Sequence, residues 1–356
     1  MKNISLIIPA YKPDEKLLST ISDAKNAGFE DILIIDDGSG KEFEEVFSAV
    51  KEVSGCTLLR HNVNKGKGAA LRTAFTYFLE NRDSGIGVIT ADADGQHLTK
   101  DIVATAQKMK ETGHIVLGCR DFTAPQVPPR SKFGNRCTIG VFRLFFGMKI
   151  SDTQTGLRAF PKDVLSELVA IKGDRYEYET NMLFHMSRNA LPFEEVTIDT
   201  VYIDDNSSSH FNPIRDSIRI YGLIIKYLFS SVAATVVDEL VFFLLKQFPI
   251  VLIPMIPQTF PAAFLARVIS SLVNYFINAK VVFGGKSNIK TLIKYYALAA
   301  VQICISAAVV YLLEYVFKVD YAIISTAIKM IVDTILFFIS FRIQHKWVFN
   351  TKGEKK

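Results

Sequence analysis

The sequence predicts a two-part chain, in which an α/β domain with a mainly parallel sheet precedes an all-α domain of four transmembrane helices. Two observations support this fold class. Within residues 1–220 the charge density is high, and short apolar runs alternate with helical patterns. From Tyr221 onward the chain contains four long apolar stretches. A length of 356 residues exceeds the usual size of one domain, and a hydrophobic content of 49% excludes a disordered chain.

The first part contains four apolar runs that we expect to form strands: Ile4–Ile8, Asp31–Ile35, Ile86–Ala91 and Ile115–Gly118. The periodicity between and after them predicts helices over about Asp14–Ala27, Glu42–Val53, Lys67–Glu80 and Thr99–Glu111. Strands and helices that alternate in this way form a Rossmann-like, doubly wound sheet. Such sheets bind ligands beyond the carboxyl ends of their strands.

Polar and acidic side chains directly follow three of these runs, in Pro9–Tyr11, Asp36–Ser39 and Asp92–Asp94. Two carboxylates spaced like Asp92 and Asp94 suit a hard divalent ion, because Mg²⁺ is usually held by one or two carboxylates plus phosphate oxygens. The alternative is that both only cap the helix near Thr99, and the spacing alone leaves both interpretations open. No GxGxxG sequence follows the first strand, which argues against a dinucleotide oxidoreductase.

Five motifs occur in order: Pro9-Ala-Tyr11, Asp36-Asp-Gly-Ser39, Asn64-x-Gly66-Lys-Gly-Ala-Ala70, Asp92-Ala-Asp-Gly-Gln-His97 and Asp152-Thr-Gln-Thr-Gly-Leu-Arg158. Together they resemble family 2 glycosyltransferases of the branch that moves a sugar onto a polyprenyl phosphate, which includes dolichyl-phosphate mannose synthase and the bactoprenol glucosyltransferases. The resemblance covers roughly residues 1–215. It implies a GT-A fold and inverting, metal-dependent transfer of a hexose from a UDP- or GDP-sugar, with Mg²⁺ or Mn²⁺ as cofactor, for cell-surface polysaccharide or glycan synthesis.

The resemblance also implies roles for individual residues. The nucleotide-binding candidates are Pro9, Ala10, Tyr11, Glu15, Asp37, Lys67 and Asp92. The metal-binding candidates are Asp92, Asp94 and Gln96. The candidates for catalysis and for binding the sugar and the acceptor phosphate are Asp94, Arg120, Arg130, Asp152, Gln154 and Arg158. For Lys67 a solvated helix N-terminus remains an alternative, and His97 is expected to be structural.

The charges of the reactants indicate what such a site requires. A nucleoside diphosphate leaving group gains negative charge as the glycosidic bond breaks, so a cation is needed there. A lipid monophosphate is largely a dianion at pH 7 and hardly needs a general base. We therefore expect Asp152 to be an orienter or a weak base, with a helix cap as the alternative. Three arginines could hold the acceptor phosphate: Arg120, Arg130 and Arg158.

The second part contains four apolar spans, each long enough to cross a bilayer: about Gly222–Phe248, Ala262–Phe283, Ile293–Phe317 and Tyr321–Ile343. A repeat is visible in it. The first and third spans begin with similar segments, Ile225-Lys-Tyr227 and Ile293-Lys-Tyr295. The second and fourth spans end with similar segments, Asn278–Phe283 and Gln344–Phe349. The repeat predicts two helical hairpins of the same orientation.

Positive charge predicts the orientation of these spans. Lysines and arginines lie around the junction of the second and third spans and around and after the end of the fourth: Lys280, Lys286, Lys290, Lys294, Arg342, Lys346, Lys352, Lys355 and Lys356. The positive-inside rule then puts both termini and the first domain in the cytosol, in a multi-pass plasma membrane protein. The mild net charge of +5 is explained by these flanks and does not imply nucleic acid. The four cysteines lack metal spacing, and no signal peptide is expected before Pro9.

The membrane half resembles the GtrA-like membrane domain, on its span count and on Val236–Leu240 and Val273–Asn278. We predict domains over residues 1–206 and 222–349, joined by an interfacial amphipathic linker over 207–221. The basic, Phe-rich segment 130–146 is either a second membrane-surface helix or a core-facing one. Charged residues in or near the spans form a polar path, a lipid-phosphate site or inter-helix pairs: Asp238, Glu239, Arg267, Lys329 and Asp333.

Two other functions are considered. A processive polysaccharide synthase usually carries a Gln-x-x-Arg-Trp motif, whereas the single Trp here, Trp347, follows the last span. A lipid-linked sugar transporter or scaffold with an inactive transferase half is disfavoured by the intact acidic motif. The sugar, the nucleotide, the lipid chain and the choice between Mg²⁺ and Mn²⁺ stay open, and a homo-oligomer is compatible with the sequence.

Overall fold

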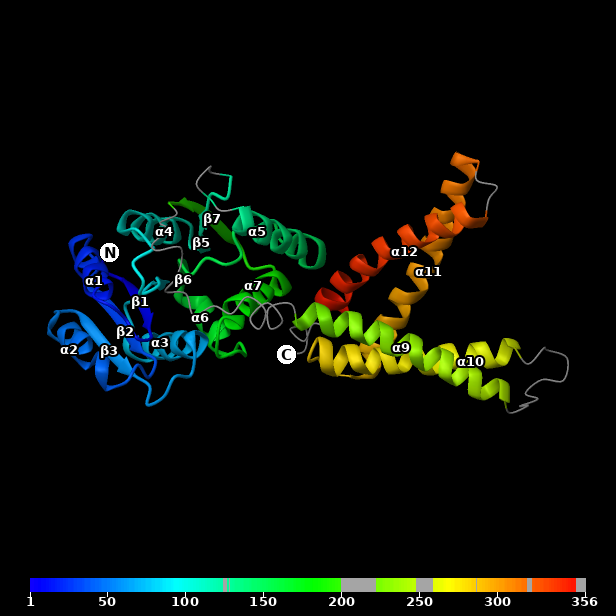
Figure 1. The fold of residues 1–356 in the computed structure, drawn as a ribbon, viewed down its shortest axis with the longest axis horizontal. Coiled ribbons are helices and arrows are strands. Elements are labelled where there is room, and N and C mark those ends of the chain that lie inside the picture. The colour runs from blue at the N-terminus through cyan, green and yellow to red at the C-terminus, as the bar shows by residue number, and fades with distance from the viewer. Residues whose placement is uncertain are drawn as a thin grey trace. The chain divides into compact units, whose positions relative to one another are not determined.

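The computed structural model describes residues 1–123, 127, 129–199, 222–247, 259–285, 287–318 and 322–349. The chain divides into two compact units, Met1–Ile220 and Tyr221–Lys356 (Figure 1). The predicted linker over 207–221 lies outside the described residues, and so does the predicted domain limit at residue 206.

Unit 1 contains a seven-stranded sheet with the order β3-β2-β1-β4-β6-β5-β7. The strands are β1 (Ile4–Ala10), β2 (Asp31–Asp36), β3 (Cys56–Arg60), β4 (Gly87–Thr90), β5 (Ile115–Arg120), β6 (Arg158–Pro161) and β7 (Phe193–Ile198). Among these strands β6 alone runs antiparallel to its neighbours. The predicted fold class, a mainly parallel α/β sheet followed by long apolar helices, is confirmed, and β3, β6 and β7 are strands that the sequence analysis did not predict.

Helices cover both faces of the sheet (Figure 1). The four predicted helices are α1 (Lys16–Asn26), α2 (Glu44–Glu52), α3 (Lys67–Asn81) and α4 (Thr99–Thr112). Three more follow: α5 (Pro129–Val141), α6 (Lys162–Val169) and α7 (Glu177–Asn189). Helices α1, α2 and α4 pack on one face, and α3 and α6 contact strands from the other.

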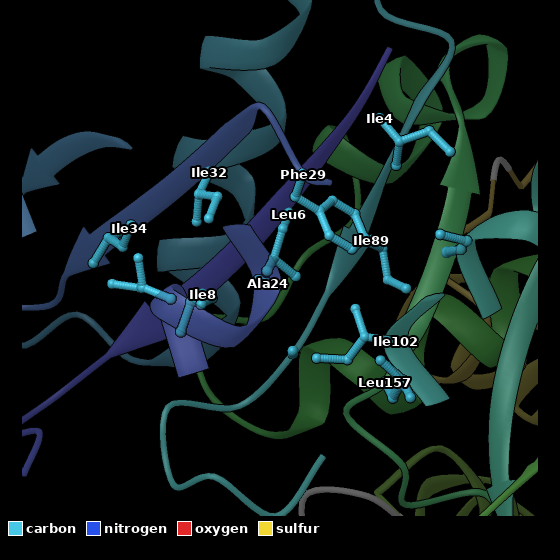
Figure 2. Packing of buried hydrophobic residues seen from close by; sticks show 14 of the residues in the cluster. Ile4, Leu6, Ile8, Ala24, Phe29, Ile32, Ile34, Ile89, Ile102 and Leu157 are labelled. Atoms are coloured by element: carbon cyan, nitrogen blue, oxygen red, sulfur yellow. The ribbon is translucent and has the colours of Figure 1, made fainter. Parts of the chain in front are cut away.

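The alternation of apolar side chains along the strands sets the sheet's orientation. Leu6 and Ile8 of β1 and Ile34 of β2 lie in one buried cluster with Ala24 of α1 and Ile102 of α4 (Figure 2). Because burial holds the strands in this register, the residues that follow them are brought to one edge of the sheet. The carboxyl ends of β1, β2, β4 and β5 meet there, and the antiparallel β6 begins there.

The segment after α5 packs inside unit 1. A π-helical turn over Phe142–Phe146 follows α5. Phe142 and Phe146 stack on Phe184 of α7, with ring centroids 5.2 and 4.3 Å apart. Phe133, one turn into α5, is 72% exposed. The end of the basic, Phe-rich segment therefore faces the core, whereas its beginning presents an aromatic ring to the surroundings.

Unit 2 consists of four long helices: α9 (Gly222–Gln247), α10 (Thr259–Ile277), α11 (Ile289–Phe317) and α12 (Ala322–Ile343). Each belongs to a segment long and apolar enough to cross a membrane. Helix α9 packs on α10, and α11 packs on α12. Both α10 and α12 continue into a π-helical turn, over Asn278–Val282 and Gln344–Val348. These two turns occupy equivalent positions of the sequence repeat.

Uncharged polar side chains join the two hairpins. Ser230 Oγ donates to Asn278 Oδ1 at 2.6 Å, and Asn278 Nδ2 donates to Gln344 Oε1 at 3.2 Å. Gln344 Nε2 in turn donates to the Tyr227 hydroxyl at 3.2 Å. Since hydrocarbon offers no hydrogen bonds, polar groups at membrane depth must find partners in the protein. Asn278 and Gln344, which the repeat aligns, do so with each other.

Four of the five charged side chains predicted in or near the spans are also paired. Arg267 Nη2 lies 3.0 Å from Asp238 Oδ2, between α10 and α9. Lys329 pairs with Asp333 one turn later on α12, and Asp333 accepts from Ser306 Oγ of α11 at 2.6 Å. The Arg267–Asp238 and Ser306–Asp333 contacts each link the two helices of one hairpin, whereas Lys329–Asp333 lies within α12.

Candidate active site

The polar residues that follow the strands gather at the carboxyl edge of the sheet. Asp92 and Asp94 come directly after β4, and Arg120 ends β5. The motif that begins at Asp152 leads into β6, whose first residue, Arg158, pairs in register with Thr90 of β4. Antiparallel β6 thus brings this motif back to the edge where the parallel strands end.

Lys67 lies between two carboxylates. Its Nζ is 2.6 Å from Asp92 Oδ1 and 3.0 Å from Glu179 Oε1, and the side chains of both Lys67 and Glu179 are largely buried. Burial opposes the charge on Lys67, but the two carboxylates raise its pKa above the ordinary value. Burial likewise opposes ionisation of Asp92, but the Lys67 ammonium outweighs it and lowers the pKa of Asp92 to about 2. Lys67 and Asp92 are therefore both charged at neutral pH.

Asp94 lies beside this cluster, and positive charge offsets its burial less than it offsets that of Asp92. Burial raises its pKa, and the negative charge of Asp92 raises it further. Its Oδ1 accepts from the Gln96 backbone N–H at 3.0 Å. The His97 ring accepts from the Asp92 backbone N–H at 3.1 Å through Nδ1, and burial lowers the pKa of His97. A neutral His97 thus orders the loop, and the remaining negative charge at Asp94 favours a cation.

A divalent ion fits the donors of this loop. Asp92 and Asp94 supply two hard carboxylates, and a Cβ atom on Gly156 would lie 2.4 Å from Asp92 Oδ2, so a glycine keeps space beside that carboxylate. Among the described residues no group of three or more His, Cys, Asp or Glu side chains forms a metal cluster. Two carboxylates suit an ion such as Mg²⁺ that takes its other ligands from a diphosphate and from water.

Asp37 holds the loop that precedes Lys67. Its side chain is almost completely buried, and its two oxygens accept from the backbone N–H groups of Lys65 (2.9 Å) and Gly66 (2.7 Å). Asn64 Nδ2 donates to it at 3.0 Å, and His61 Nδ1 lies 2.7 Å from Oδ1. Because so many partners surround this carboxylate, the geometry favours a role in positioning the start of α3.

Arg120 and Asp152 form a bidentate pair. Arg120 Nε lies 2.7 Å from Asp152 Oδ2, and Nη2 lies 3.2 Å from Oδ1. The Gln154 backbone N–H also donates to Oδ1 at 2.9 Å. The Asp152 side chain is 0% exposed, whereas that of Arg120 is 30% exposed. The carboxylate is therefore engaged in orienting a guanidinium whose outer side remains accessible.

The other two arginine candidates, Arg158 and Arg130, are placed differently from Arg120. Arg158 is 1% exposed, and its guanidinium donates to the backbone carbonyls of Thr155 (2.9 Å) and Glu179 (2.8 Å). This placement favours a scaffold that ties the motif to α7. The backbone of Arg130 lies in the first turn of α5, but its side chain lies outside the described part of the structure. The side chain of Gln154 is exposed at the edge.

The other nucleotide-binding candidates lie at the end of β1. Pro9 and Ala10 are its last residues, Tyr11 follows it, and Glu15 precedes α1. Lys12 connects this turn to the loop that follows β2, because its backbone N–H donates to Ser39 Oγ at 2.9 Å. These candidates thus lie on the β1 side of the acidic edge, which is the part of the carboxyl edge that holds Asp92 and Asp94.

Sequence reasoning missed Glu179. It lies in the first turn of α7, where Glu177 is also found. Acidic residues in a first helical turn are common because they interact favourably with the helix dipole, so nothing in the local pattern marked Glu179 as part of the site. Only the fold brings its carboxylate to Lys67.

The Gly156→Ala variant is expected to weaken nucleotide binding in the presence of a divalent ion by about tenfold, since one displaced charge contact is worth roughly 1–2 kcal/mol. The added Cβ would meet Asp92 Oδ2 at 2.4 Å, so the carboxylate must shift from its place beside Lys67. Titration calorimetry with UDP or GDP and Mn²⁺ would measure this. The matched control is Gly140→Ala, because a Cβ there meets nothing within 4 Å. Equal affinities in both variants would contradict the prediction.

Two families of known domains match the chain. Glycosyl transferase family 2 matches residues 5–169, and the GtrA/DPMS transmembrane domain matches residues 226–354. The first match contains the acidic edge, and the second contains all but the first few residues of the four long helices. Both agree with the families that the motifs resemble.

Several known proteins are similar to this one. The UDP-N-acetylglucosamine–dolichyl-phosphate N-acetylglucosaminyltransferase of Methanococcus voltae is 30% identical over 57% of this chain and 87% of its own length. The dolichyl-phosphate β-glucosyltransferase of Trichomonas vaginalis is 31% identical over 45% of this chain and 53% of its own. A similar fold is found in a crystal structure of glucosyl-3-phosphoglycerate synthase from Mycobacterium tuberculosis with Mn²⁺, UDP and glucosyl-3-phosphoglycerate. The TM-score is 0.47 and the sequence identity is 17%, over 63% of this chain and 78% of that one.

Three findings support the same family. They are the match to its model, the 87% of the Methanococcus voltae relative that the chain covers, and the α/β sheet with Asp92 and Asp94 at its carboxyl edge. This chain belongs to glycosyl transferase family 2 and is a membrane glycosyltransferase whose second half is a GtrA/DPMS transmembrane domain.

Proposed function

We propose that this protein transfers a hexose from a UDP- or GDP-sugar to a polyprenyl phosphate, with inversion and with Mg²⁺ or Mn²⁺, at the cytosolic face of the plasma membrane. The observation that carries the proposal is the acidic pair Asp92 and Asp94, bordered by the cations of Lys67 and Arg120. The acceptors in the names of the two curated relatives, which are dolichyl phosphates, support a lipid phosphate.

The donor occupies the Asp92 side of the edge in this proposal. Asp92 and Asp94, with Gln96 beside them, hold the divalent ion, which when bound offsets the negative charge that grows on the diphosphate leaving group. Lys67, which contacts Asp92, adds its own positive charge to the same group in this proposal. The nucleotide extends toward the end of β1, along Pro9, Ala10, Tyr11 and Glu15, while Asp37 keeps the start of α3 in place.

The acceptor phosphate occupies the Arg120 side. This phosphate is largely a dianion at pH 7 and attacks the sugar carbon directly. The site therefore needs a cation to hold the phosphate more than it needs a base to activate it. Arg120 provides that cation, and Asp152 fixes its orientation. Arg130 and Gln154 remain candidates for the acceptor and the sugar, and Arg158 supports the motif from inside.

Charge orients the membrane half in the same proposal. Lysines that follow the second span and basic residues that follow the fourth favour a cytosolic location for both termini. Nucleotide sugars are made in the cytosol, so the donor and the catalytic domain share a compartment. We keep residues 1–206, 207–221 and 222–349 as the proposed limits of the catalytic domain, the interfacial linker and the membrane domain.

The test is product formation by the purified full chain. Radiolabelled UDP-glucose, UDP-N-acetylglucosamine and GDP-mannose are each incubated with a short polyprenyl phosphate and with Mg²⁺ or Mn²⁺. The proposal predicts a butanol-extractable labelled lipid from one donor, lost with EDTA and restored by added metal. No lipid product from any donor, in protein that binds the nucleotide, would contradict it.

One observation favours an added transport function. A cavity of about 620 Å³ lies among the four helices of unit 2, and Gln302, Asp333 and Gln344 are among the polar residues that line it. Polar side chains along a membrane cavity are typical of a substrate path. In sealed proteoliposomes, lipid-linked sugar that becomes protected from external periodate faster than in protein-free vesicles would support transport. Equal protection in both would exclude it.

A further inference from the structure

We propose that Lys67 is a built-in counterion that occupies Asp92 while no divalent ion is bound, and that Glu179 is the residue that receives Lys67 when the ion binds. Glu179 is thus a positioning residue: it takes over the Lys67 ammonium, so that Asp92 becomes available to the divalent ion. The inference rests on the proposed metal-dependent function, because it concerns the same carboxylates.

The first support is the position of the ammonium. Lys67 Nζ is 2.6 Å from Asp92 Oδ1, so it takes up a carboxylate oxygen that a divalent ion would use. The same Nζ is 3.0 Å from Glu179 Oε1. An ammonium has three donors, so it can contact both carboxylates at once and then keep only one of them. A short movement of a flexible four-carbon side chain separates the two arrangements.

The second support is the balance of charge. Asp92, Asp94 and Glu179 present three carboxylates to a partly buried region, and Lys67 contacts two of them. A divalent ion at Asp92 and Asp94 would add two positive charges beside the ammonium. In that state the ammonium is repelled by the ion and attracted by Glu179, so the carboxylate of Glu179 becomes its partner. Without Glu179, displacement of Lys67 would leave a buried ammonium unpaired.

The third support is that Glu179 is held in place from behind. Its backbone carbonyl accepts from Arg158 Nη1 at 2.8 Å, and Arg158 is 1% exposed. The neighbouring residue Tyr178 is completely buried, and its hydroxyl donates to the Leu168 carbonyl at 2.8 Å. The backbone at the start of α7 is therefore held by buried contacts, and Glu179 offers Lys67 a second partner there.

The experiment measures Mn²⁺ binding to the full chain in detergent, from the electron paramagnetic resonance signal of free Mn²⁺, with no nucleotide present. Lys67→Gln is expected to bind Mn²⁺ about tenfold more tightly than the wild type, because a competing cation is removed. Glu179→Gln is expected to bind Mn²⁺ about tenfold more weakly, because Lys67 then has only Asp92 as a partner. The controls are Lys65→Gln and Glu80→Gln, which remove exposed charges from the same loop and helix.

A double variant separates positioning from a general loss of structure. Because Glu179 acts through Lys67, Glu179→Gln added to Lys67→Gln should leave the Mn²⁺ affinity of Lys67→Gln unchanged. Opposite shifts in the single variants, together with this result, support the inference. Shifts in the same direction, no shifts, or a loss of affinity in the double variant overturn it. A wild type that binds no Mn²⁺ even with UDP- or GDP-sugar would overturn the proposed function as well, whereas normal wild-type binding confines the failure to the counterion.

Discussion

The Asp94→Asn variant is expected to lose sugar transfer by at least about 10²–10³-fold in kcat, the usual cost of removing one group that stabilises transition-state charge. Asp94 lies beside the Lys67–Asp92 pair, and burial together with the charge of Asp92 raises its pKa, so its carboxylate is the one that most lacks a cation. The amide of asparagine has nearly the same shape but carries no charge. Initial rates of labelled lipid formation at saturating donor and metal would measure the effect.

Two controls accompany this variant. Asp23→Asn removes an exposed carboxylate from α1 and should keep full activity. Thermal unfolding of Asp94→Asn should stay within a few degrees of the wild type, because a buried carboxylate with a raised pKa is partly relieved by neutralisation. Turnover near the wild-type rate in Asp94→Asn would refute the assignment of the metal to this loop.

The Arg120→Lys variant is expected to lower kcat/KM for polyprenyl phosphate about 10- to 100-fold, with little change in KM for the nucleotide sugar. Lysine keeps the charge but cannot reproduce the two parallel contacts that Arg120 makes with Asp152. Hydrogen bonds to charged groups contribute about 1.5–3 kcal/mol each, and 1.4 kcal/mol is a factor of ten. Steady-state kinetics with each substrate varied in turn separates the two effects.

A second arginine of the same geometry provides the control. Arg82 also forms a bidentate pair, with Asp31, at the amino end of β2, on the opposite edge of the sheet. Arg82→Lys should therefore leave kcat/KM for the acceptor unchanged, although it loses a similar pair of contacts. A kcat/KM for the acceptor that is the same in Arg120→Lys and the wild type would show that the lipid phosphate is held elsewhere.

The fold was predictable where burial is greatest. Strands β1, β2, β4 and β5 are continuous apolar runs, because central parallel strands are buried on both faces. The three unpredicted strands lack that signal. Strand β3 is only partly buried at one edge of the sheet, and β7 at the other edge contains Glu194 and Glu195. Strand β6 has only four residues, among them Arg158 and Pro161.

The candidate site was predictable in part. Asp92 and Asp94 follow a strand directly, so the sheet topology alone brings them to the binding edge. The contact between Arg120 and Asp152 required the antiparallel β6, which a pattern of alternating strands and helices does not reveal. Glu179 required the packing of α7 near α3, which depends on tertiary contacts between residues more than 100 positions apart.

The anomeric configuration of the product tests the central claim, direct displacement by the lipid phosphate, most directly. Asp152 is buried and both of its oxygens contact Arg120, which disfavours this carboxylate as a nucleophile and supports the proposed single displacement. A single displacement from an α-linked nucleotide sugar would give a β-linked lipid phosphate. Proton and phosphorus NMR of the purified product would show the β anomer if the account is correct. An α-linked product would contradict it, because retention requires a second displacement or a different attacking group.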